Sequence, residues 1–138
     1  MRLLARLLSP RATVYAHCDL PCGVYDPAQA RIEAESVRAI AEKYQGNDDP
    51  AFRARAIQIK EERSDLVKHH LWVLWTDYFK PPHFEKYPEL HELFNKATKK
   101  AGGGPGGVKS STDPATGQEL LDLIAQIDKI FWETKAAA

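Results

Sequence analysis

Apolar residues recur three or four positions apart in four segments of the chain, which is the spacing of one helix face. These segments are residues 27–45, 50–79, 88–100 and 114–134. Three of them open with an Asp-Pro pair, in which Asp favours the helix N-cap and Pro the first helical position. No segment shows the strict alternation that is typical of a strand. The pattern therefore predicts an all-α fold, an antiparallel four-helix bundle.

Two of the expected helices carry a charged residue within a row that is otherwise mostly apolar. The inward row of the first helix is expected to be Glu33, Val37, Ile40 and Tyr44. The row of the second is expected to be Phe52, Ala56, Ile59, Arg63, Leu66, His70 and Val73. Charged side chains are rarely buried without a partner. Glu33 and Arg63 therefore either reach solvent at the edges of their rows or face one buried polar site.

The third and fourth helices have uninterrupted apolar rows, and glycine and proline mark the connections. The two rows are Leu90, Leu93, Phe94 and Ala97, and Leu120, Ile124, Ile127 and Phe131. Gly46 follows the first helix, while Pro81 and Pro82 forbid continuation of the second. Residues 101–112 hold five of the chain's eight glycines. This composition predicts a flexible Gly-rich loop without packing content.

The chain has 138 residues, which suggests a single domain, and its charge balance narrows the choice of partners. Lys plus Arg and Asp plus Glu both number 19, so the formal net charge is zero. This balance disfavours nucleic acid or a membrane surface as the partner. No apolar run approaches the ~18 residues of a transmembrane helix. The two cysteines, Cys18 and Cys22, do not make a disulfide framework.

Residues 1–16 differ from the rest, because they contain three arginines and no acidic residue. Such a segment is typical of a prosequence or targeting peptide, and the alternative is a frayed N-terminal extension. Pro10 and Arg11 interrupt its apolar stretch, which makes it a poor secretory signal and favours a cytoplasmic protein. Small residues before His17 suit a cut after Ala16. Whether the prosequence also directs export stays open.

The next residues, HCDLPCGVYD at 17–26, place one histidine and both cysteines within six positions. Cleavage before His17 would free its α-amine, which can chelate a metal together with the amide nitrogen of Cys18. The thiolates of Cys18 and Cys22 would complete a planar set of two nitrogens and two sulfurs, which suits Ni(II) or Cu(II) better than tetrahedral Zn(II). The alternative is two unrelated thiols or an incidental disulfide.

Four stretches of the chain together resemble nickel-dependent superoxide dismutases. They are HCDLPCGVYDPAQARIEAES, KHH, DYFKPPHFEKYPELH and DPATGQ…AQIDKIFWETK. The resemblance implies a four-helix bundle that assembles as a homohexamer, a prosequence that a protease removes, and one nickel ion per chain. It also implies disproportionation of superoxide to oxygen and hydrogen peroxide by Ni(III)/Ni(II) cycling at a metal hook, residues 17–25.

The resemblance implies a ligand set in the hook and two residues that support it. His17 supplies its amine and imidazole, Cys18 its amide nitrogen and thiolate, and Cys22 its thiolate. Glu33 and Arg63 fall where the family hydrogen-bonds the imidazole of His17. Hydrogen-bond partners of a metal ligand fix its orientation and tune the metal, so this role would explain both misplaced charges.

Further roles concern the substrate. By resemblance, Tyr25 lies over the open axial face with Asp19 near it, and Tyr78 pairs with Tyr25. Lys80 is a candidate for the positive potential that would guide a small anion. Structural roles are expected for His69, His70, His83 and His91, and core or subunit-interface positions for Trp72, Trp75 and Trp132. A nickel or copper carrier or sensor, or a helical scaffold without metal, is the rival interpretation.

Overall fold

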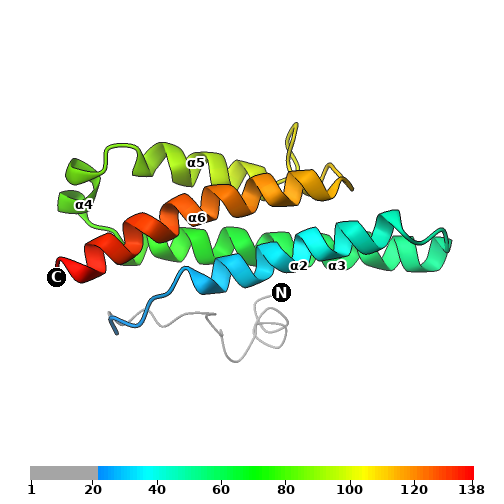
Figure 1. Ribbon diagram of the computed structural model, residues 1–138, viewed down its shortest axis with the longest axis horizontal. Helices are drawn as coiled ribbons and strands as arrows, with labels where there is room; N and C mark the ends of the chain where they lie inside the picture. Colours follow the sequence, from blue (N-terminus) through cyan, green and yellow to red (C-terminus); the bar gives the residue numbers. More distant parts are fainter. Residues whose placement is uncertain (1–21) are drawn as a thin grey trace, which may run out of the picture.

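The computed structural model describes residues 22–138, and the described part is helical, with no strand. Its elements are α2 (Ala28–Gln45), α3 (Pro50–Val73), the π-helix η1 (Leu74–Tyr78), α4 (Pro81–Lys86), α5 (Leu90–Lys100) and α6 (Pro114–Ala136). Helix α2 packs against α3 and α6, and α5 packs against α6 and α3 (Figure 1). This arrangement confirms the predicted all-α bundle, whose four long helices are α2, α3, α5 and α6.

The helix that was expected to reach Phe79 changes its geometry before its end. Helix α3 runs directly into η1, where the amide of Phe79 donates to the carbonyl of Leu74 at 3.0 Å. The sequence missed α4, which begins at Pro81, the residue that was expected only to stop a helix. Proline stops a helix that precedes it but fits the first position of the next one, because it has no N–H to leave unpaired.

The buried rows of α5 and α6 agree with the prediction, whereas those of α2 and α3 share only Val37 and Ala56 with the predicted rows. The buried residues of α2 are Ala30, Ala34, Val37 and Ala41, and those of α3 are Ala56, Lys60, Ser64, Val67 and Leu71. Ile40, Tyr44 and Ile59 are only half-buried. The predicted rows were therefore wrong in register. Alanines, together with Lys60 and Ser64, make up much of the true contact face, and an argument from apolar periodicity overlooks such residues.

The Gly-rich loop 101–112 is packed, so the prediction that it has no packing content was wrong, while its flexibility stays a prediction. Val108 is 2% exposed and lies in the core. The ammonium group of Lys60 donates to the carbonyls of Val108 and of Ser111, the latter at 2.6 Å. Gly107 is required by space, because an added Cβ would lie 2.2 Å from the carbonyl oxygen of Gly102. Backbone carbonyls thus replace the side-chain contacts that a glycine-rich sequence lacks.

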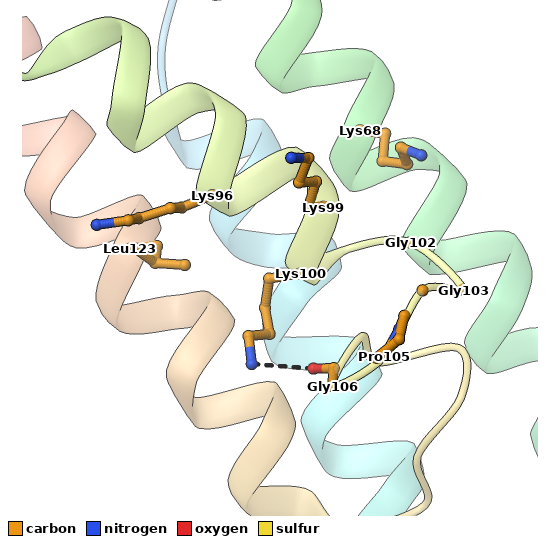
Figure 2. A pocket seen from close by; sticks show the side chains of 10 residues that line it. Lys68, Lys96, Lys99, Lys100, Gly102, Gly103, Pro105, Gly106 and Leu123 are labelled. Carbon is orange, nitrogen blue, oxygen red and sulfur yellow. Dashed lines mark hydrogen bonds between the residues drawn. The ribbon is translucent and has the colours of Figure 1, made fainter.

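A cavity of about 680 Å³ lies between this loop, α3, α5 and α6 (Figure 2). Four lysines line it, namely Lys68, Lys96, Lys99 and Lys100. The charge is partly compensated, because Lys96 pairs with Glu92 and Lys100 pairs with Glu119. The Lys100 ammonium also donates to the carbonyl of Gly106 at 2.9 Å, as Figure 2 shows. Lys100, on α5, thus contacts both the loop and α6.

Candidate metal hook and its cavity

The described chain enters α2 through residues 22–26, which lie beside the C-terminal end of α6 (Figure 1). Predicted site residues fall on both sides of this boundary. Ala16, His17, Cys18 and Asp19 lie outside the described residues. Cys22 and Tyr25 lie within them, and so do Glu33, Arg63, Tyr78 and Lys80.

Cys22 is exposed, and the residue after it turns the chain toward the bundle. The Sγ atom of Cys22 lies 4.0 Å from the carbonyl oxygen of Val24. Gly23 has φ +72°, a left-handed conformation that glycine adopts without a steric penalty. Asp26 then contacts the first residue of α2, since its Oδ1 accepts from the amide of Ala28 at 2.8 Å. The thiol is therefore presented outward on a turn that is anchored at the start of α2.

Tyr25 and Tyr78 are brought into contact, although 52 residues of chain separate them in sequence. Their ring centroids lie 5.7 Å apart at an interplanar angle of 56°. Two contacts with α6 also hold Tyr78 in place. Its ring centroid lies 4.3 Å from that of Phe131, and its hydroxyl is 2.7 Å from Oγ1 of Thr134. Tyr78 is the last residue of η1, so the π-turn sets the direction in which this ring points.

A cavity of about 480 Å³ opens beside these two rings. It is lined by Gly23, Tyr25, Asp77, Tyr78, Lys80, His83, Thr134, Lys135 and Ala138. Three of the predicted residues, the two tyrosines and Lys80, thus share one wall. Asp77, His83, Thr134 and Lys135 were missed by sequence reasoning. All four lie in the stretches DYFKPPHF and IFWETK, whose resemblance to the family was the available signal.

Groups of both charges line this cavity. Lys80 and Lys135 contribute two ammonium groups, and Asp77, whose Oδ1 accepts from the hydroxyl of Thr76, contributes a carboxylate. The Lys135 ammonium donates to the carbonyl of Gly23 at 3.3 Å. It also lies 5.9 Å from the centroid of the Tyr78 ring. The cavity therefore has a cation at the point where the hook segment meets α6.

His83, for which a structural role was expected, lies on the same wall. Its ring stacks on Tyr78 at 5.8 Å, and its Nδ1 accepts from the amide of Lys80 at 3.2 Å. Burial, followed by the neighbouring charges of Lys80 and Lys86, lowers the pKa of His83 from its ordinary value of 6.5. The neutral imidazole thus holds its proton on Nε2.

Glu33 and Arg63, the charged residues predicted within apolar rows, form an ion pair. Nη1 of Arg63 lies 3.2 Å from Oε2 of Glu33, which joins α3 to α2. The Glu33 side chain is 18% exposed and that of Arg63 38%. Of the two interpretations that the sequence left open, the arrangement favours a shared polar site over two separate solvated edges.

Among residues 22–138, no group of three or more His, Cys, Asp and Glu side chains could hold a metal ion.

His91, one of the histidines expected to be structural, packs on Phe84 with a ring-centroid distance of 4.0 Å, and its Nδ1 accepts from the indole of Trp75. Within residues 22–138, no helix is long and apolar enough to cross a membrane.

Comparison with known proteins gives a consistent set of similarities. The family described as nickel-containing superoxide dismutase matches residues 12–135. A superoxide dismutase (Ni) of Streptomyces coelicolor is 67% identical over 135 residues, which cover 98% of this chain and all of that protein. The native structure of a nickel superoxide dismutase is 69% identical with a TM-score of 0.82, covering 87% of this chain and 99% of its own. A second solved structure, described as having the nickel ligation of the oxidised state, is 70% identical with the same TM-score and coverage.

Proposed function

This chain belongs to the family of nickel-containing superoxide dismutases, and we propose that its metal site is the N-terminal hook, residues 17–25. The protein is a nickel-dependent oxidoreductase that converts two superoxide anions and two protons to oxygen and hydrogen peroxide. The observation that carries this function is 67% identity to a nickel superoxide dismutase along essentially the whole chain. A nickel or copper carrier or sensor, and a metal-free scaffold, are set aside on the same observation.

The proposed ligands are His17 through its amine and imidazole, Cys18 through its amide nitrogen and thiolate, and Cys22 through its thiolate. Two features of the described part support them. The Cys22 side chain is exposed next to a cavity, and residues 22–138 offer no other metal-binding cluster. When bound, nickel supplies the Ni(III)/Ni(II) couple that accepts an electron from one superoxide and returns it to another. Thiolate and amide donors lower the potential of that couple.

Tyr25, Tyr78, Asp19 and Lys80 are proposed to handle the substrate. The contact between the two tyrosine rings supports a role in excluding larger molecules, because the pair narrows the cavity beside the hook. Thr134 lies within hydrogen-bond distance of the hydroxyl of Tyr78. The hydroxyl of Tyr25 is proposed to hold superoxide or ordered water. Lys80 adds positive potential at the wall. Asp19 is proposed to lie near Tyr25.

Glu33 and Arg63 are proposed to orient the imidazole of His17, which would bind the nickel ion. Their 3.2 Å ion pair supports this role, since it places a partly buried carboxylate in the second turn of α2, about 8 Å from the start of that helix at ~1.5 Å per residue. A carboxylate that accepts from the ring nitrogen fixes the imidazole, and the guanidinium holds the carboxylate in its charged form.

Residues 1–16 are proposed to be a prosequence that a protease removes between Ala16 and His17. The difference in coverage supports this: the curated relative matches 98% of this chain, whereas the solved relative matches 87% of it with 99% of its own length. The solved chain is therefore the shorter one. We place the mature protein in the cytoplasm on the poor secretory character of this segment; dismutase activity in cell fractions tests that.

A homohexamer is proposed as the working assembly. Three tryptophans support a large interface, because Trp72, Trp75 and Trp132 are 50%, 42% and 49% exposed on the single chain. Exposed aromatic groups on this scale are typical of subunit contacts. Light scattering of the trimmed protein should give the mass of six chains, and a monomer mass would contradict the assembly.

The decisive experiment compares nickel content and dismutase activity in three forms of the chain. They begin at Met1, at Ala16 and at His17. The form that begins at Ala16 is the matched control, because one extra residue removes the free amine from His17 and changes almost nothing else. We expect about one nickel per chain and activity in the His17 form alone. Equal nickel in all three forms would show that the amine is not a ligand, and active nickel-free protein would contradict the function.

A further inference from the structure

The C-terminal turn of α6 brings a lysine to the cavity beside the hook. Lys135 is exposed, and its ammonium nitrogen donates to the carbonyl of Gly23 at 3.3 Å. Gly23 directly follows Cys22 and lines the same cavity as Tyr25 and Tyr78. In the part of the chain that the structure describes, Lys135 forms no ion pair with a carboxylate. No carboxylate among residues 22–138 therefore neutralises its charge through an ion pair.

We propose that Lys135 guides superoxide into this cavity, and that the Gly23 carbonyl holds its ammonium group at the wall where the substrate enters. The inference rests on the proposed function and adds to it a residue for which the sequence predicted no role. An ammonium group has three protons to donate, and the carbonyl takes one of them. The other protons stay available to a small anion, and the full positive charge remains.

The neighbouring contacts explain why the cation is held at this place. Thr134, the residue before Lys135, meets the hydroxyl of Tyr78 at 2.7 Å. One turn of α6 thus fixes both an aromatic wall of the cavity and the cation above it, since Lys135 lies 5.9 Å from the Tyr78 ring centroid. The position near the C-terminus of a helix also favours a positive charge, because the helix dipole is negative there.

Lys80 and Lys135 flank the cavity from different elements. Lys80 comes from the start of α4 and Lys135 from the end of α6, while Asp77 and the chain terminus at Ala138 lie at the same wall. Lys135 differs from Lys80 in that a hydrogen bond ties its ammonium to the hook segment itself. This contact places the cation beside the turn that carries Cys22.

The test uses the nickel-loaded form that begins at His17, with Lys135→Gln as the main variant. Gln removes the charge but can still donate to the Gly23 carbonyl. Lys129→Gln, on the side of α6 that faces Tyr87, is the matched control with the same change in net charge. Lys135→Arg restores the charge. The second-order rate constant for superoxide loss is measured from about 0.01 M to about 0.3 M ionic strength, over which the Debye length falls from roughly 30 Å to under 8 Å.

We expect Lys135→Gln to lower the rate constant about two- to fourfold at low ionic strength, as one lost charge near the path of an anion should. The difference should vanish at high ionic strength. Lys129→Gln and Lys135→Arg should behave like the parent. The dissociation constant of azide, titrated by absorption of the resting protein, should rise in Lys135→Gln alone, and all variants should keep one nickel per chain.

Two results would overturn the proposal. One is a Lys135→Gln variant with the parent's rate constant and salt dependence, which would leave Lys135 without a part in guidance. The other is loss of nickel in that variant, which would make Lys135 a structural clamp of the hook. An inactive parent would instead contradict the proposed function, so the two failures are distinguishable.

Discussion

At both ends of α6 a lysine ammonium group meets the backbone carbonyls of a connecting segment, but the two contacts differ in burial. Next to the N-terminal end of α6, Lys60 of α3 is 2% exposed and donates to the carbonyls of Val108 and Ser111 in the Gly-rich loop. At the C-terminal end, Lys135 is exposed and donates to Gly23 in the hook segment. The hydrogen bond between an ammonium group and a carbonyl therefore stabilises the fold at Lys60, where water is excluded. At Lys135, where water is present, the ammonium group can also meet a small anion.

The energetics of the two contacts follow from this difference. A buried charge is tolerated only when hydrogen bonds replace its hydration. Burial lowers the pKa of Lys60 from its ordinary value of 10.5, while Glu61 raises it and Lys109 lowers it. The loop carbonyls are needed to keep the ammonium in place. Lys135 stays hydrated, so its single hydrogen bond to Gly23 contributes little stability and leaves the group free to exchange partners.

The largest effect should come from breaking the buried contact. Lys60→Met removes the donor and leaves the carbonyls of Val108 and Ser111 unpaired, which should lower the free energy of unfolding by about 3 kcal/mol. Urea denaturation measures it. Lys109→Met is the control in the same loop: its exposed pair with Asp65 should be worth less than about 1 kcal/mol. Equal losses in both variants would contradict the assignment of the loop to the core.

The next comparison is between Gly107, in the loop that precedes α6, and Gly23, which lies beside the C-terminal end of α6. Gly107→Ala places a Cβ against the backbone of Gly102, and we expect a loss of about 2 kcal/mol from overpacking. At Gly23 an added Cβ meets nothing within 4 Å, so Gly23→Ala should lose only about 1 kcal/mol, from its φ of +72°. Thermal unfolding of the two variants checks the order. A larger loss at Gly23 would show that the hook segment is packed as tightly as the loop.

The sequence predicted the buried rows that consist mainly of large apolar residues, whereas it missed the alanines of α2. Leu90, Phe94, Ile124 and Phe131 belong to such rows and are buried as expected. The register failed where Lys60 and Ser64 occupy the buried row, because the partners of Lys60 lie 48 to 51 residues further along the chain. Periodicity within one helix contains no information about carbonyls that a distant loop supplies.

The same limit applies to the candidate site. Glu33 and Arg63 stood out because each broke an apolar row, and the structure pairs them. Tyr25 and Tyr78 came from the family resemblance. Lys135 lies on an exposed helix end in a sequence that offers no reason to single it out. Lys135 becomes a candidate only in the tertiary structure, in which α6 brings it to the hook.

A smaller effect tests the aromatic wall at the hook end. Tyr78→Phe removes the hydroxyl that meets Thr134, and Thr134→Val removes the same hydrogen bond from the other side. Each variant should lose about 1 kcal/mol of unfolding free energy and keep its nickel. If the hydroxyl matters only for packing, both variants should also share the parent's inhibition by azide. We expect Tyr78→Phe to change that inhibition, and an unchanged value would remove this hydroxyl from the handling of anions.

The smallest effect concerns His83, the titratable group that shares the cavity with Lys80. Burial, and then Lys80 and Lys86, lower the pKa of His83 in the folded state below the ordinary 6.5. As the pH falls through this window, the unfolded chain binds a proton before the folded one does, so stability should decrease from about pH 6.5 downward. His83→Gln should flatten this part of the stability profile, measured by urea denaturation at a series of pH values. His91→Gln, which removes an imidazole stacked on Phe84 outside the cavity, is the control. A profile that is equally steep in His83→Gln would mean that neither burial nor the charges of Lys80 and Lys86 lower the pKa of this ring.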